Sequence, residues 1–200
     1  ILEWRVVKNG CLSSDLITIT NNEPTKATVG STQNRCDFET VLTGNTPVEG
    51  VGRWSVIKGS GVFDDVLDPQ TRVTDLGYGE NIFRWTIQKG ICSSFADLTV
   101  NNLKVEVDAG PEITTCSRVV NMRGSAVPPG ATGLWTVVPG IGGGTIPAME
   151  GSKPNAMISG LEYGQNAFTW SINNKGCISS DIVYVNNSMP TPVDAGPNQT

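Results

Sequence analysis

The sequence contains no histidine among its 200 residues. Histidine is the commonest general base and a frequent metal ligand, because its ordinary pKa lies close to neutral pH. Its absence argues against an active site of the Ser-His-Asp type. The five cysteines include no C-x-x-C pair, which argues against a zinc knuckle or a thioredoxin-type redox site. We therefore expect a chain that is not an enzyme, with no catalytic residue, no cofactor and no metal site.

Positive charge is also scarce. Lys and Arg number 14 against 19 Asp and Glu, so the net charge is −5. Nucleic-acid binding depends on a basic stripe, and the sequence has none. An anionic membrane surface repels an acidic chain, and no apolar run approaches the roughly 18 residues that span a bilayer. We expect neither nucleic acid as a partner nor membrane insertion of this segment.

The sequence is rich in internal repetition. Trp85 precedes Cys92 by the same spacing that separates Trp170 from Cys177, and each segment then closes on a pair of asparagines. Residues 76–85 match residues 161–170 at alternate positions, and the run Val-Asp-Ala-Gly-Pro occupies both 107–111 and 193–197. The period of about 83 residues is too long for a solenoid and fits self-contained domains in series.

The matches define the expected domain boundaries. Residues 24–102 and 103–187 are predicted to be complete repeats. Residues 1–23 read as the C-terminal part of a preceding repeat, and residues 188–200 as the start of a following one. Half a domain is not expected to fold alone, so the sequence leaves open how residues 1–23 are stabilised.

The local pattern predicts strands. In residues 81–88 the apolar Phe83, Trp85 and Ile87 alternate with outward-facing positions, and residues 166–173 repeat this period of two. Lys89 and Gly90, like Lys175 and Gly176, are suited to hairpin turns. Glycine and proline mark most other junctions, and no stretch carries a helical apolar stripe. We predict an all-β chain of tandem immunoglobulin-like β-sandwiches, each with about seven strands in two packed sheets.

Four tryptophans recur at two positions of the repeat. They lie on the inward face of the predicted strands, where each indole buries roughly 150–250 Å². A sugar-stacking platform is the alternative role, which we consider weaker because the alternation points these rings inward. The predicted core tryptophans are Trp54, Trp85, Trp135 and Trp170.

An acidic group precedes Pro69. Asp64, Asp65 and Asp68 offer carboxylates of the kind that bind calcium in loops. The corresponding region of the second repeat, 142–147, has no acidic residue. An ion shared by the repeats needs ligands in both, so we interpret these aspartates as turn residues.

The cysteines also occupy two fixed positions. Cys36 and Cys116 fall before the second strand of a repeat, whereas Cys11, Cys92 and Cys177 fall after the late hairpin turn. A conserved register from copy to copy is typical of cysteines that form structural disulfides. Disulfides persist in oxidising compartments, which predicts that the protein is exported to the cell surface or beyond.

Two connectivities are compatible with this register. One bridge per domain would join Cys36 to Cys92 and Cys116 to Cys177, each contributing roughly 4 kcal/mol in the chain-entropy model. The two positions, however, lie at opposite ends of such a sandwich, and a Cα separation beyond about 7 Å prevents a bond. The second arrangement therefore joins Cys36 to Cys177 across a domain junction. In that arrangement Cys11, Cys92 and Cys116 would have partners outside the sequence.

Particular motifs resemble a known family. The Val-Asp-Ala-Gly-Pro opening, the Asn-x-Phe-x-Trp run and the Lys-Gly-Cys turn resemble PKD-like immunoglobulin-fold repeats. Such repeats are common in very large secreted proteins of Bacteroidetes, including gliding-motility adhesins and other type IX secretion cargo. The first repeat departs from the pattern, with Thr28 in place of the aspartate. The resemblance implies a spacer or adhesive stalk and names no ligand.

Two functions follow as hypotheses. The first is a non-catalytic structural stalk of a large cell-surface adhesin, whose partners are neighbouring repeats of the same chain. The second is an accessory module that binds surface polysaccharide or other cell-surface proteins through its loops. Repetition and paired cysteines favour the stalk.

Overall fold

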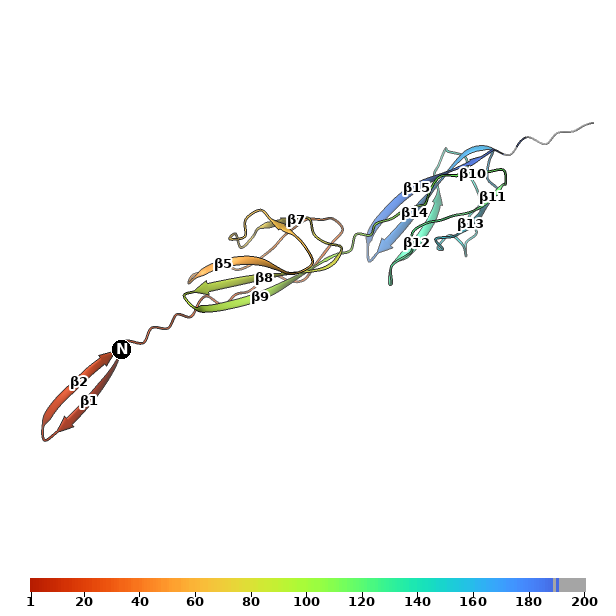
Figure 1. The fold of residues 1–200 in the computed structure, drawn as a ribbon. Helices are drawn as coiled ribbons and strands as arrows, with labels where there is room; N and C mark the ends of the chain where they lie inside the picture. Colours follow the sequence, from red (N-terminus) through yellow and green to blue (C-terminus); the bar gives the residue numbers. More distant parts are fainter. Residues whose placement is uncertain (189, 191–200) are drawn as a thin grey trace, which may run out of the picture. The chain divides into compact units, whose positions relative to one another are not determined.

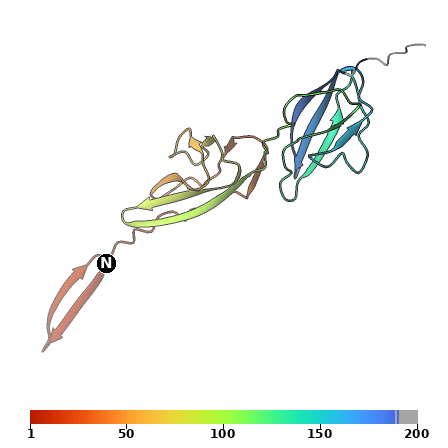
Figure 2. The ribbon, with the colours of Figure 1, turned by 45° about the vertical axis from the view of Figure 1, so that its right-hand side comes forward.

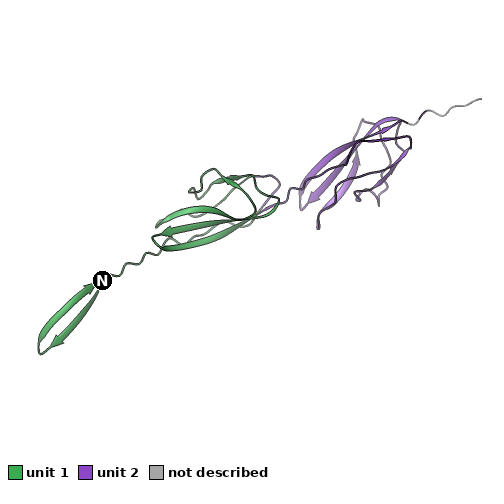
Figure 3. Ribbon diagram, viewed as in Figure 1, with its two compact units in different colours: residues 1–33, 39–100 green, residues 34–38, 101–200 purple. Residues whose placement is uncertain are grey.

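The computed structural model describes residues 1–188 and 190, and β-strands are the only regular elements among them (Figure 1). The prediction of an all-β immunoglobulin-like fold is confirmed. No helix that could cross a membrane occurs in this part of the chain. The chain divides into two compact units. Unit 1 comprises residues 1–33 and 39–100, and unit 2 comprises residues 34–38 and 101–200 (Figure 3).

Unit 1 contains a hairpin and most of a seven-stranded sandwich. The first sheet has the order β3-β9-β8-β5, and the second has the order β4-β7-β6. The hairpin is formed by β1 and β2, which pair with each other. The bounds are β1 Leu2–Lys8, β2 Cys11–Ile17, β3 Gln33–Arg35, β4 Thr40–Val41, β5 Val51–Lys58, β6 Val62–Phe63, β7 Arg72–Thr74, β8 Gly79–Lys89 and β9 Cys92–Asn102.

Unit 2 repeats this plan. One sheet has the order β10-β15-β14-β12, and β11 pairs with β13 in the other. β10 runs parallel to β15, whereas β14 is antiparallel to both of its neighbours. An isolated bridge between Thr145 and Ser159 replaces the counterpart of β6. The bounds are β10 Ile113–Thr115, β11 Val119–Asn121, β12 Thr132–Val137, β13 Met157–Ser159, β14 Gly164–Asn174 and β15 Cys177–Asn187.

The longest strands form one hairpin in each unit, β8–β9 in unit 1 and β14–β15 in unit 2. Both ribbon views show these hairpins clearly, in green and in blue (Figures 1 and 2). Along β8 the side chains of Phe83, Trp85 and Ile87 are fully buried, and the residues between them are half-buried. β14 has the same alternation from Phe168 to Ile172, as the sequence period of two predicts, and Ala167 is buried in addition. Each unit thereby closes an apolar core of its own.

The hairpin turns differ from the prediction in one repeat. In unit 2 the turn consists of Lys175 and Gly176, both with positive φ, as in a type I′ turn. In unit 1 it consists of Gly90 and Ile91, one residue later than predicted, and only Gly90 has positive φ. A glycine at the first central position suits a type II′ turn, which also satisfies the strand twist. Cys92 and Cys177 therefore each open the strand that follows the turn, although the two turns differ in type.

The hairpin β1–β2 presents a contrast to its two counterparts. Leu2, Trp4 and Val6 hold the positions that Phe83, Trp85 and Ile87 hold in β8, yet they are exposed, Trp4 by 75%. The paired strands satisfy each other's backbone hydrogen bonds, but the apolar face has no packing partner in the described part of the chain.

Candidate functional site

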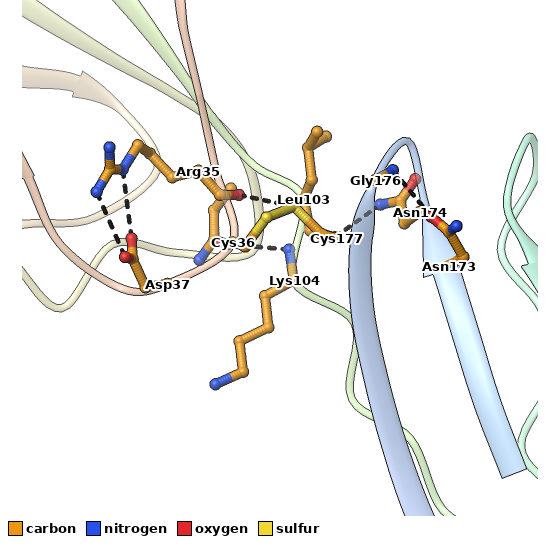
Figure 4. Close-up of a disulfide and its surroundings, with 10 residues drawn as sticks. Arg35, Cys36, Asp37, Leu103, Lys104, Asn173, Asn174, Gly176 and Cys177 are labelled. Atoms are coloured by element: carbon orange, nitrogen blue, oxygen red, sulfur yellow. Dashed lines mark hydrogen bonds and ion pairs between the residues drawn. A yellow bond between two sulfur atoms is a disulfide. The ribbon is translucent and has the colours of Figure 1, made fainter.

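A disulfide bond between Cys36 and Cys177 is the most distinctive chemical feature of the structure (Figure 4). Cys36 follows directly after β3, and Cys177 is the first residue of β15, opposite Asn174 across the hairpin end. Their Cα atoms are 5.2 Å apart, within the range that a disulfide spans. Both residues belong to unit 2, because the short segment 34–38 is part of that unit.

Hydrogen bonds hold the same segment in place. The backbone N–H of Leu103 donates to the carbonyl oxygen of Arg35 at 2.7 Å, and the Nδ2 of Asn174 donates to the carbonyl oxygen of Leu103 at 2.9 Å (Figure 4). Asn101 Nδ2 donates to Asn34 Oδ1 at 3.1 Å. The residues that flank the bridge are therefore fixed by backbone and amide contacts as well as by the sulfur–sulfur bond.

The remaining cysteines are thiols. Cys11 and Cys116 are exposed and Cys92 is half-buried. Of the connectivities that the sequence left open, the structure contains the bond from Cys36 to Cys177, and neither bond within a repeat is formed. In sequence terms this bond joins the repeat 24–102 to the repeat 103–187.

The four predicted core tryptophans are buried. Their exposed fractions are 2% or less, so none offers a face on which a sugar could stack. Each indole N–H also has a carbonyl acceptor, which removes the cost of burying it. Trp54 donates to Asp68, Trp85 to Asn45, Trp135 to Lys153 and Trp170 to Ser125, each at 3.1 Å.

A buried asparagine organises the entry to each long hairpin. The Oδ1 of Asn81 accepts from the N–H groups of Ser60 and Gly77, and its Nδ2 donates to carbonyl oxygens that include Gly77 at 2.9 Å. Asn166 repeats this arrangement in unit 2, and both side chains are fully buried. In the sequence the two asparagines stand out only as matched positions of the repeat, although a polar residue on the inward face of a strand is a signal for such a role.

In the acidic loop of unit 1, which contains Asp64, Asp65 and Asp68, two of the aspartates stabilise turns of the backbone. The Oδ1 of Asp65 accepts from the N–H of Leu67, and the Oδ1 of Asp68 accepts from the N–H of Gln70, each at 2.8 Å. Across the described residues, no three His, Cys, Asp or Glu side chains gather in a group that could hold a metal ion.

An open groove of about 480 Å³ lies on the outer face of β5 and β8 in unit 1. Arg53, Ser55 and Thr86 supply hydrogen-bonding groups, and Val51 and Leu67 supply apolar surface. At the matching positions of unit 2, Leu134 replaces Arg53. The guanidinium of this groove is therefore specific to the first repeat.

One ion pair stands out on the surface of unit 1. The guanidinium of Arg84 contacts both carboxylate oxygens of Asp97, at 2.7 and 2.8 Å. This hydrogen bonding lowers the pKa of Asp97 below its ordinary value and raises the pKa of Arg84. Arg84 also lies 4.0 Å from the ring centre of Phe95, a cation–π distance.

Neither a protein family nor a curated protein matches the sequence. Solved structures with a similar fold include the insect immune protein hemolin, with 9% identity over 84% of this chain and 48% of hemolin, at a TM-score of 0.49. An I-band fragment of titin has 8% identity over 82% of this chain and 65% of the fragment, at a TM-score of 0.39. A SusE-like surface-located polysaccharide-binding protein from Bacteroides thetaiotaomicron has 12% identity over 82% of this chain and 34% of that protein, at a TM-score of 0.33. The chain spans about half the length of hemolin, and at such identities the similarity concerns the fold alone.

Proposed function

We propose that the chain is a non-catalytic stalk segment of an exported cell-surface adhesin. The observation that carries this proposal is the disulfide between Cys36 and Cys177, which links one sequence repeat to the next. Structural disulfides form and persist mainly in oxidising compartments, which favours an extracellular location. The resemblance to PKD-like repeats of Bacteroidetes supports a role in surface attachment or gliding motility, with type IX secretion as the route of export.

The bridge suits a segment that carries tension. The bonded cysteines are 141 residues apart in sequence, and the stretch between them contains the strands of the core from β4 to β14. A force that reaches residue 36 passes directly to residue 177 through covalent bonds. The residues between them are shielded, because their strands need not separate to transmit the load.

Stretching single molecules by their two ends tests this role. With the bridge intact, the stretch of chain between the two cysteines, whose sequence separation is 141, cannot contribute to the unfolded length. Cys36→Ser, or reduction of the bond, is expected to add roughly 470–510 Å of extensible chain, at 3.3–3.6 Å per residue. Cys92→Ser serves as the matched control, since Cys92 is a thiol in this structure, and is expected to add nothing. Equal extension of the oxidised and reduced chains would contradict the proposal.

A binding module for surface polysaccharide is the second candidate, and the groove at Arg53 favours it. Its guanidinium and hydroxyl groups suit an anionic sugar, because charge-assisted hydrogen bonds to a carboxylate are the strong ones. An array of neutral and anionic polysaccharides tests this function. Saturable binding that Arg53→Ala abolishes, and that the charge-matched control Arg123→Ala preserves, would support it. Failure of every anionic polysaccharide to bind would exclude it.

A further inference from the structure

The cysteines fall into two classes by their place in the repeat. We call Cys36 and Cys116 the early cysteines, because each directly follows a short strand, β3 or β10. We call Cys11, Cys92 and Cys177 the late cysteines, because each is the first residue after a two-residue hairpin turn. The bond in the structure joins the early cysteine of one repeat to the late cysteine of the repeat that follows it in sequence.

The surroundings of Cys116 reproduce those of Cys36. At Cys36, the preceding residue Arg35 accepts a hydrogen bond from the N–H of Leu103 at 2.7 Å. At Cys116, the preceding residue Thr115 accepts one from the N–H of Ser188 at 2.9 Å. Leu103 and Ser188 are equivalent, since each directly follows the asparagine pair that ends a repeat. The backbone frame that presents Cys36 to its partner is therefore already assembled around Cys116.

The turns before Cys92 and Cys177 can be compared through their neighbours. The turn before Cys177 lies beside the chain that enters unit 2, because Asn174 donates to the carbonyl oxygen of Leu103. The turn before Cys92 lies beside the chain that enters the sandwich of unit 1. A Cβ atom placed on Gly90 would be 4.0 Å from the Nδ2 of Asn22. The turns that precede Cys92 and Cys177 thus both lie beside the chain that leads into their own sandwich.

From these matches we propose that Cys92 and Cys116 each form a disulfide of the same kind as Cys36–Cys177, with a cysteine of a neighbouring repeat. Cys116 takes as its partner the late cysteine of another repeat of this kind, attached after residue 187. Cys92 takes the early cysteine of a repeat attached before residue 24. The pairing rule is that the early cysteine of each repeat bonds to the late cysteine of the following repeat. In an array of repeats, these disulfides form a continuous ladder. The rule holds whether or not the array bears load, so it is independent of the stalk function.

The chemistry of each bond is thiol–disulfide exchange with a small disulfide such as glutathione disulfide. The thiolate of Cys116 attacks one sulfur of the oxidant and releases one glutathione thiolate, which leaves a mixed disulfide. The thiolate of the late cysteine then attacks the Cys116 sulfur and releases the second glutathione. Two thiols lose two protons and two electrons, and the oxidant becomes two thiols.

Insertion of one repeat into the full chain tests the rule. A second copy of residues 103–187 is placed between Asn187 and Ser188, which supplies a late cysteine at the correct distance from Cys116. The protein is oxidised in a glutathione buffer, its remaining thiols are alkylated, and its linked peptides are mapped by mass spectrometry. We expect Cys116 bonded to the inserted copy of Cys177, the Cys36–Cys177 bond retained, and the inserted copy of Cys116 alkylated. Cys116→Ser in the same chain is the matched control and should leave the inserted copy of Cys177 alkylated.

Two outcomes would overturn the proposal. One is alkylated Cys116 in protein whose Cys36–Cys177 bond has formed. The other is a bond between the early and late cysteines inside the inserted repeat. If the inserted chain does not fold, the same mapping on the native exported protein decides the question. There Cys116 must be linked to a cysteine that opens the last strand of another repeat, and any other partner refutes the ladder. Neither result bears on the stretching experiment, so the two proposals fail separately.

Discussion

Trp54 and Trp85 are register partners on the neighbouring antiparallel strands β5 and β8, and their ring centres lie 5.1 Å apart. Trp135 and Trp170 form the same pair in unit 2, with ring centres 5.0 Å apart. Directly opposed aromatic residues are among the strongest cross-strand pairs in antiparallel sheets. In each unit the pair fills the centre of the core, and the sandwich closes around it.

Removing one indole should destabilise its unit severely. Trp85→Ala creates a cavity in a site that is fully buried, and we expect a loss of about 3–5 kcal/mol of unfolding free energy. The matched control is Trp4→Ala, at the equivalent position of the exposed hairpin, for which we expect a change within about 0.5 kcal/mol. Hydrogen exchange read by mass spectrometry reports the hairpin β1–β2 and the sandwich of unit 1 separately. Equal effects of the two substitutions would show that the hairpin is buried in solution.

Two glycines provide the space for the indoles. A Cβ on Gly52 would lie 2.1 Å from Trp85, and one on Gly133 would lie 2.3 Å from Trp170. Gly52→Ala and Gly133→Ala should each cost about 1–3 kcal/mol through overpacking. At Gly143 the nearest atom would be 3.4 Å away, so Gly143→Ala should be close to neutral. Thermal unfolding measures the three variants, and an unchanged melting temperature for Gly133→Ala would contradict this packing.

The corner asparagine should be sensitive to truncation. Asn166→Ala removes the acceptor for the N–H groups of Gly143 and Glu162, which lie 2.9 and 3.0 Å from its Oδ1. We expect a loss of about 1–3 kcal/mol in total, because two part-buried N–H groups are left without an acceptor. The neighbouring residue Gln165 is exposed on the same strand, so Gln165→Ala is the matched control. Denaturant unfolding of both variants makes the comparison, and similar midpoints would refute the role of Asn166.

Acidification should weaken unit 1 through the pair of Arg84 and Asp97. Hydrogen bonding from Arg84 lowers the pKa of Asp97 below the ordinary value of 3.8. The pair therefore stabilises the folded state fully above that ordinary value, and the contribution is lost as pH falls through the lower folded pKa. Asp97→Asn should be less stable than the parent at pH 6, and the difference should shrink toward pH 2. Asp64→Asn, at an exposed position of the same unit, is the control. A difference that stays constant with pH would contradict this account.

The strands and the core residues could be predicted from the sequence because their signal is local. Side chains of a strand alternate between its faces, so the spacing of Phe83, Trp85 and Ile87 predicts that they share one face. Trp4 lies on a strand with the same spacing and is exposed, because burial also requires a second sheet to pack against.

The same local rule misplaced the turn between β8 and β9. Gly90 suits either the first or the second position of a two-residue turn, and the register in which the strands pair decides between them. It did not predict the role of Asn81, because two of the groups that satisfy its amide, on Ser60 and Val100, come from segments distant in the chain.

Internal repetition and strand periodicity were sufficient to predict repeated β-sandwich modules with paired tryptophans and two classes of cysteine. The choice of bonded cysteines could be read from the fold alone. Spacing along the chain is equally compatible with a bond inside a repeat or between repeats, whereas a disulfide requires its two Cα atoms to lie within about 7 Å. That distance depends on which end of a sandwich each residue occupies. For Cys36 and Cys177 the folded chain brings it to 5.2 Å.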